Sequence, residues 1–167
     1  PSRDGSLVAV SMSSQGSELG TLRIYETETG RALADEIPRV HGPTAGGSVC
    51  WNEDSTGVYY TRYPAPGERA AEDLAFYQQV FFHRLGTPVN TDRYEVGKEF
   101  PRIAEIQLES SPDHRWQLAT VANGDGGEFA HFLRNPQGRW SQVTRFGEDV
   151  SQAAFGRDPS FIEWPRD

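Results

Sequence analysis

A short motif recurs along the chain and limits what it can fold into. A turn around an aspartate precedes a run of aliphatic, aromatic and β-branched residues, with the aspartates at Asp4, Asp54, Asp113 and Asp158. The spacings of 50, 59 and 45 residues are close to the length of a β-propeller blade, about 40–50 residues. Asp side chains bond nearby backbone N–H groups. We therefore interpret these aspartates as turn formers rather than as ligands or catalytic acids.

Each motif begins a unit of short strands separated by turn residues. Strands with the hydrophobic pattern of a half-buried sheet are expected at 7–12, 21–26, 31–34, 48–51, 58–63, 79–85, 93–95, 105–108, 116–121, 129–134, 140–144 and 161–164. Helical periodicity is almost absent, and 68–77 reads as an inserted surface loop with at most one helical turn. Four short antiparallel strands per unit are typical of propeller blades.

The sequence thus predicts an all-β chain, a partial β-propeller of about three to four blades with four-stranded antiparallel sheets. We expect a partial blade at 2–34, whole blades at 48–95 and 105–144, and a partial blade at 150–164. A propeller protects its strand edges by closing its ring, and an arc this short cannot close. The expectation is therefore an excerpt of a larger ring, processed or cut before Pro1, or a chain that needs partner strands. A self-contained sandwich of the same strands is the alternative.

Charge and composition exclude some classes of partner. The 167 residues carry a net charge of −8, and no Lys/Arg cluster exceeds two adjacent residues. Because phosphate binding needs concentrated positive charge, we expect neither nucleic acid nor an anionic membrane as a partner. Cys50 is the only cysteine, so an internal disulfide is impossible, and the compartment stays open between cytoplasm and periplasm.

No complete catalytic or cofactor-binding motif is present. Ser17 stands between glycines but in the wrong order for a nucleophile elbow, and the glycine-rich segment 123–127 lacks the Lys-Ser/Thr of a phosphate-binding loop. None of the four histidines has a His or Cys partner at metal-ligand spacing, and His83 and His131 are interpreted as equivalent repeat positions. The sequence predicts no catalytic residue, metal or cofactor in this chain.

Three phrases resemble the prolyl oligopeptidase family. They are the run from Asp4 to Glu18 (DGSLVAVSMSSQGSE), the run from Gly57 to Pro64 (GVYYTRYP) and the run from Gln79 to Thr87 (QVFFHRLGT). The likeness extends over about residues 2–135. It implies a parent serine endopeptidase that cleaves short peptides after proline, with a seven-bladed propeller over an α/β-hydrolase domain that carries a Ser-Asp-His triad. That hydrolase domain and its triad are absent from this chain, and the propeller would cap and gate the active site.

The same resemblance implies substrate-binding residues and partners. Tyr59 corresponds to an aromatic that lines an apolar subsite upstream of the scissile proline, and Leu133 falls near a second subsite position. The implied partners are the hydrolase domain of the same parent protein and short proline-containing peptides. Tyr59 as ordinary blade core remains an alternative. A non-enzymatic propeller that binds proteins or peptides, and a glycan-acting propeller with facing carboxylates, also remain open.

Overall fold

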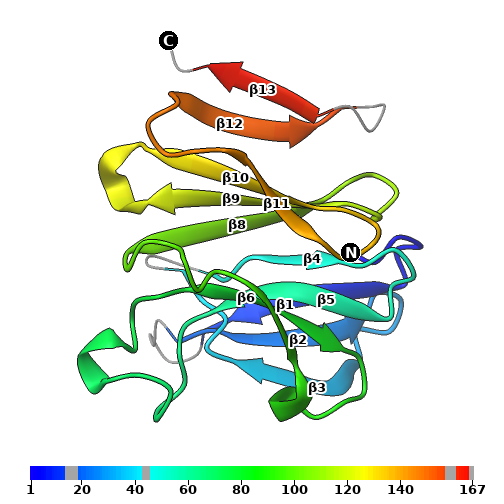
Figure 1. Ribbon diagram of the computed structural model, residues 1–167. Helices are drawn as coiled ribbons and strands as arrows, with labels where there is room; N and C mark the ends of the chain where they lie inside the picture. The colour runs from blue at the N-terminus through cyan, green and yellow to red at the C-terminus, as the bar shows by residue number, and fades with distance from the viewer. Residues whose placement is uncertain (14–18, 43–45, 157–160, 166–167) are drawn as a thin grey trace.

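The computed structural model describes residues 1–13, 19–42, 46–156 and 161–165, and within these ranges the strands form four separate antiparallel sheets (Figure 1). The first sheet contains β1 (Leu7–Met12), β2 (Thr21–Glu26) and β3 (Ala32–Pro38). The second contains β4 (Val49–Trp51), β5 (Gly57–Arg62), β6 (Gln79–Arg84) and β7 (Arg93–Val96). The third contains β8 (Ala104–Ser110), β9 (Gln117–Asn123), β10 (Phe129–Arg134) and β11 (Trp140–Thr144), and the fourth contains β12 (Val150–Phe155) and β13 (Phe161–Pro165).

The strand order in every sheet follows the chain, as expected for blades joined by hairpins. The described helical segments are three short 3-10 turns at Ala71–Asp73, Val89–Thr91 and Gly124–Gly126, the first of them inside the predicted loop at 68–77. The all-β, partial-propeller prediction is confirmed. The sheets do not merge into a two-layer sandwich, and the described strands do not close a ring.

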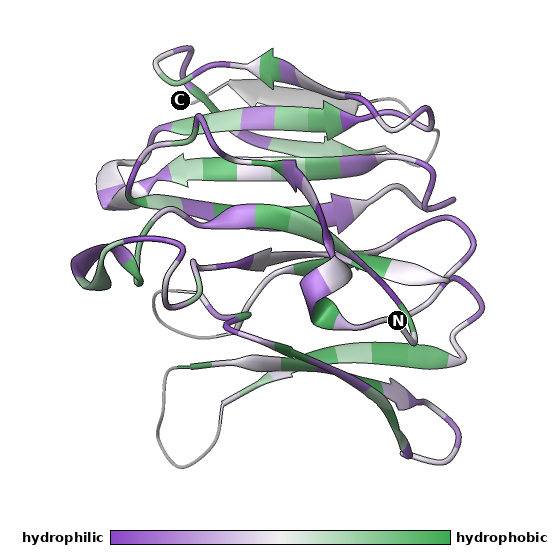
Figure 2. Cartoon of the chain, turned by 60° about the horizontal axis from the view of Figure 1, so that its bottom comes forward, coloured by the Kyte–Doolittle hydropathy of each residue, from purple (hydrophilic) through white to green (hydrophobic). Residues whose placement is uncertain are grey.

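The sheets stack face to face, and their alternating side chains form the core. From β5, Val58 and Tyr60 pack toward the first sheet against Leu22, Ile24 and Ile37. The intervening Tyr59 faces the opposite way, into a cluster with residues of β8 and β9 such as Ile106 and Val121. Figure 2 shows the hydrophobic residues on the strands and hydrophilic residues in many of the loops. Because both faces of the second sheet are covered, β5 is the most continuously buried strand, with only Arg62 partly accessible.

Side chains of neighbouring segments satisfy the free edge of β8. The amide of Ile106 donates to Gln78 Oε1 at 2.7 Å, and the amide of Leu108 donates to Ser48 Oγ at 2.7 Å. Gln78 is almost completely buried and also donates to the carbonyl of His41 at 3.1 Å. An unpaired strand edge is a site for aggregation, so these contacts both cap the edge and join the second and third sheets.

The aspartate turns have one geometry in three copies. Asp4 Oδ1 accepts from the amide of Ser6 at 3.0 Å, Asp54 Oδ1 from that of Thr56 at 3.1 Å, and Asp113 Oδ1 from that of Arg115 at 3.1 Å. These bonds confirm the turn-former interpretation, and the hydrogen bonds hold the pKa of each carboxyl below its usual range. The fourth copy, at Asp158, lies outside the described residues, as does Ser17.

The residue after each of these aspartates adopts a left-handed conformation. The φ angles are 73° at Gly5, 56° at Ser55 and 59° at His114. Glycine takes this conformation without steric cost, whereas other residues are strained in it. His114 therefore holds in the third turn the left-handed conformation that glycine adopts in the first.

Candidate functional site

A hollow of about 230 Å³ opens between the second and third sheets at the end that carries the aspartate turns. Its wall combines one aromatic ring with imidazole, guanidinium, amide and carboxylate groups, which belong to Tyr59, His114, Arg115, Gln117, Arg134, Glu53 and Asp54. The hairpin turn before β5 and the one before β9 place these groups opposite each other. The site can therefore offer both an apolar surface and hydrogen-bond donors to a peptide.

Tyr59 belongs to the core and to this hollow at once. Its side chain is nearly buried, with 3% of the residue exposed, and its ring packs on that of Phe82 with centroids 4.8 Å apart. Burial raises the pKa of Tyr59 to about 12, so the phenol stays protonated at neutral pH. Only an edge of the Tyr59 ring lines the hollow, and the packing on Phe82 holds the ring in place.

Arg134 closes the hollow and links two sheets. Its guanidinium lies 4.8 Å from the centre of the Tyr59 ring, and its Nε donates to Glu95 Oε2 of β7 at 3.0 Å. The same carboxylate oxygen accepts from Trp140 Nε1 at 2.9 Å. Since the Glu95 side chain is only 4% exposed, this is a buried ion pair across the seam. The sequence analysis missed it, because nothing in the sequence marks three residues on three strands as neighbours.

Leu133 lies on a different surface from Tyr59. It pairs with Leu118 of β9, and it is half-buried. Its neighbour Phe132 packs into the core between the second and third sheets, and successive strand residues point to opposite faces. Leu133 thus faces the fourth sheet, and the structure does not bring the two sequence-predicted substrate residues together.

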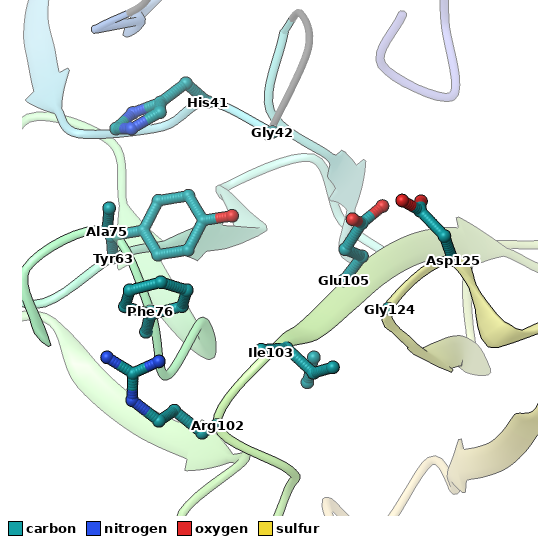
Figure 3. A pocket seen from close by; sticks show the side chains of 11 residues that line it. His41, Gly42, Tyr63, Ala75, Phe76, Arg102, Ile103, Glu105, Gly124 and Asp125 are labelled. Atoms are coloured by element: carbon teal, nitrogen blue, oxygen red, sulfur yellow. The ribbon is translucent and has the colours of Figure 1, made fainter.

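A second pocket, of about 410 Å³, lies at the opposite end of the same sheets (Figure 3). Its apolar wall contains Tyr63, Phe76 and Ile103, and two carboxylates, Glu105 and Asp125, stand at one side. Tyr63 follows the last residue of β5, whereas the first hollow lies at the start of that strand. The two sites are therefore separated by the length of a blade strand.

A buried ionic network joins the first two sheets. His83 is completely buried; its Nδ1 lies 2.7 Å from Asp92 Oδ1 and its Nε2 3.0 Å from Asp35 Oδ1 of β3. Tyr60 donates its hydroxyl proton to Asp92 Oδ2 at 2.7 Å, and the amide of Gly86 donates to Asp35 at 2.6 Å. Burial alone would lower the pKa of His83, but the hydrogen bonds and charges of Asp92 and Asp35 outweigh it, and the pKa is raised above its ordinary value.

The interpretation of His83 and His131 as equivalent positions was wrong. His83 pairs with Val58, four residues after Asp54, whereas His131 pairs with Thr120, seven residues after Asp113. The two rings consequently face opposite sides of their sheets. His131 is bonded through Nδ1 to Thr144 Oγ1 at 2.6 Å, and burial lowers its pKa. The sequences of β6 and β10 have similar compositions, so the different positions of the two histidines relative to the aspartate turns were not apparent from the sequence.

Other reactive groups have simple structural surroundings. Burial raises the pKa of the Cys50 thiol to about 12, so its reactive thiolate is not formed near neutral pH. Among the described residues, no group of three or more His, Cys, Asp or Glu side chains is arranged to hold a metal ion. The described part of the chain contains no helix long and apolar enough to span a membrane.

Comparison with known proteins identifies the family. The model of the prolyl oligopeptidase N-terminal β-propeller domain matches residues 1–153. The prolyl endopeptidase of Elizabethkingia meningoseptica is 27% identical over 169 residues, covering 99% of this chain and 23% of that protein. The dual function macrocyclase-peptidase POPB of Amanita bisporigera is 28% identical over 132 residues, covering 75% of this chain and 16% of that protein. The chain thus spans less than a quarter of the length of these curated relatives.

Solved structures share the fold. A prolyl endopeptidase studied for its inter-domain dynamics superimposes with a TM-score of 0.72 at 20% identity, over 86% of this chain and 21% of that one. Prolyl oligopeptidase B from Galerina marginata, bound to a 35mer hydrolysis and macrocyclization substrate, gives a TM-score of 0.69 at 18% identity, over 85% of this chain and 22% of that one. With the stacked blades and the family match over most of its length, the chain belongs to the prolyl oligopeptidase family, as part of its N-terminal β-propeller domain.

Proposed function

We propose that this chain is the part of a propeller that caps and gates the active site of a prolyl oligopeptidase-like serine endopeptidase. In this proposal the four sheets are successive blades, the first and last of them partial. The nucleophile, base and acid reside on an α/β-hydrolase domain of the same parent protein, and the propeller segment is not itself catalytic. The substrates are short peptides cleaved after proline. The match to the propeller family over residues 1–153 is the observation that carries the proposal.

The hollow at the aspartate-turn end is the proposed point of contact with substrate. The accessible edge of Tyr59 offers an apolar surface to a side chain upstream of the scissile proline. Phe82 and Arg134 hold the ring from two sides, so little conformational entropy is lost when a peptide binds. Leu133, one seam further on, is proposed as a second apolar contact for longer peptides.

Stacked, rigid blades suit a gating role. A covered chamber excludes water and large substrates from the reacting groups. The seams of this chain are held by buried polar contacts as well as by apolar packing, including the Glu95–Arg134 ion pair and the network of His83. Because these contacts hold adjacent blades together, a folded protein cannot pass between the blades to reach the active site.

Two measurements test the proposal. The purified 167-residue chain should not hydrolyse a proline-containing chromogenic peptide, and turnover that persists through rigorous purification would contradict it. In the parent enzyme, Tyr59→Leu should lower kcat/KM for peptides with a bulky apolar residue upstream of proline more than for those with glycine there. Tyr25→Leu, a change of the same type on the first sheet, is the control. Equal effects across both substrates would remove Tyr59 from the site.

A further inference from the structure

The pocket at the end opposite the aspartate turns carries negative charge that the chain does not neutralise. It encloses about 410 Å³, the size of a small-ligand site. Its one guanidinium is already engaged: Arg102 Nε donates to Asp73 Oδ1 at 2.9 Å, and its charge lies 3.6 Å from the centre of the Phe76 ring. Arg102 is therefore committed to holding the loop after β5 in place and is not available to the pocket's carboxylates.

Glu105 and Asp125 are those carboxylates. Figure 3 shows them turned toward each other across one side of the pocket. Neither forms an ion pair with any of the residues that the structure describes. Two facing carboxylates repel each other and are stabilised by a cation placed between them.

Tyr63 supplies an independent indication of a ligand. The residue is only 4% exposed, yet its hydroxyl points into the pocket toward Glu105 (Figure 3). Its ring rests against that of His41, with centroids 4.9 Å apart, while within the described part of the chain the hydroxyl has no hydrogen-bond partner. The one polar atom of an otherwise buried side chain thus opens onto the pocket, where the hydroxyl oxygen can accept a hydrogen bond from a donor that arrives with a ligand.

We infer that this pocket binds the α-ammonium group of a peptide N-terminus whose first side chain is apolar. The ammonium would lie between Glu105 and Asp125 and donate to the Tyr63 hydroxyl. The first side chain would lie on Phe76 and Ile103; the latter is 47% exposed at the pocket mouth, where such a contact would cover it. The site lies a strand length away from the proposed subsite at Tyr59, and it needs no proline in its ligand.

Calorimetric titration of the 167-residue chain with the tripeptide amide Phe-Gly-Gly-NH2 tests the inference. The peptide lacks proline, so its binding is independent of the proposed peptidase role. We expect saturable binding that the N-acetylated peptide loses. Glu105→Gln and Asp125→Asn should each weaken binding at least about tenfold, since each removes a charge-assisted hydrogen bond. Glu109→Gln makes the same change in charge on the same strand outside the pocket, and should bind as the wild type does.

Circular dichroism of each variant shows whether it retains the fold, and Asp125→Asn, in an exposed loop, leaves the core untouched. Binding of the acetylated peptide within twofold of the free peptide would overturn the inference. So would Glu105→Gln and Asp125→Asn variants that keep the fold and bind like Glu109→Gln. Preferential binding of N-acetyl-Gly-Lys-Gly-NH2 would assign the site to lysine side chains and contradict recognition of the N-terminus.

Discussion

His83 Nε2 lies 3.0 Å from Asp35 Oδ1 across the seam between the first and second sheets. The histidine side chain is completely buried and the aspartate is 5% exposed. With Asp92 on the other ring nitrogen, a single imidazole ring lies between two carboxylates inside the protein, and its protonated form can donate to both. Breaking a buried ion pair leaves uncompensated charge, so this seam should be sensitive to changes at position 83.

Replacing His83 by leucine should lower the free energy of unfolding by about 3–5 kcal/mol. The variant leaves both Asp35 and Asp92 buried without a cation. Adding Asp35→Asn and Asp92→Asn should recover part of this loss, because the unpaired charges are then removed. Urea unfolding of the three proteins measures the differences. If the free energy of unfolding of His83→Leu lies within about 1 kcal/mol of that of the wild type, the network contributes little to stability.

The same network predicts a pH dependence. The pKa of His83 is raised above its ordinary value of 6.5, so the folded state binds this proton more tightly than the unfolded state. The contribution of His83 protonation to the free energy of unfolding is complete below pH 6.5 and is lost as the pH rises through the pKa of His83 in the folded state. Burial lowers the pKa values of His131 and His114. Their protonation therefore decreases the free energy of unfolding as the pH falls below 6.5. The stability difference between wild type and His83→Leu should therefore shrink with rising pH; a constant difference would contradict the assignment.

The ion pair behind the hollow gives a third prediction. Glu95→Ala should destabilise the chain by about 3 kcal/mol, because it leaves Arg134 buried without its partner. Trp140 loses its hydrogen bond in the same variant, so its fluorescence should change. Glu99→Ala removes an exposed carboxylate a few residues away and should leave stability and fluorescence unchanged. Equal unfolding curves for the two variants would show that the buried pair is dispensable.

Backbone conformation alone accounts for a fourth effect. Gly5 has a φ of 73° and no atom within 4 Å of the position that a Cβ would take. Gly5→Ala should therefore cost about 1–2 kcal/mol through backbone strain rather than through a clash. Gly126 has equally open surroundings without a positive φ, and Gly126→Ala should not share this cost. Thermal unfolding of both variants compares them, and equal losses would argue against strain at Gly5.

Local patterns were sufficient to predict the architecture. The aspartate turns and the alternating strands depend on residues near one another in sequence, so the strands and the stacking of blades could be anticipated. Contacts across seams could not. Asp35 and His83 are 48 residues apart, and the partners Glu95 and Arg134 are 39 apart. Which residues meet in such pairs depends on how adjacent sheets are positioned against each other in three dimensions.

The same limitation applied to the candidate site residues. Tyr59 could be singled out from a family phrase, but not its dual place in the core and in the hollow. Leu133 was grouped with it, although the alternation of β10 directs the leucine toward the next seam. The carboxylates of the second pocket, Glu105 and Asp125, stand on a strand and a loop whose proximity the sequence does not reveal.

The proposal that firmly packed blades control access to the active site is tested most directly in the parent enzyme. The measurement is the ratio of kcat/KM for a folded proline-containing protein to that for a short proline peptide, in wild type and in His83→Leu. We predict that the wild type cleaves only the short peptide, and that loosening the seam between the first two blades raises the ratio while the short peptide is still cleaved. A ratio that stays the same in a variant with measurably weaker blade packing would contradict the account.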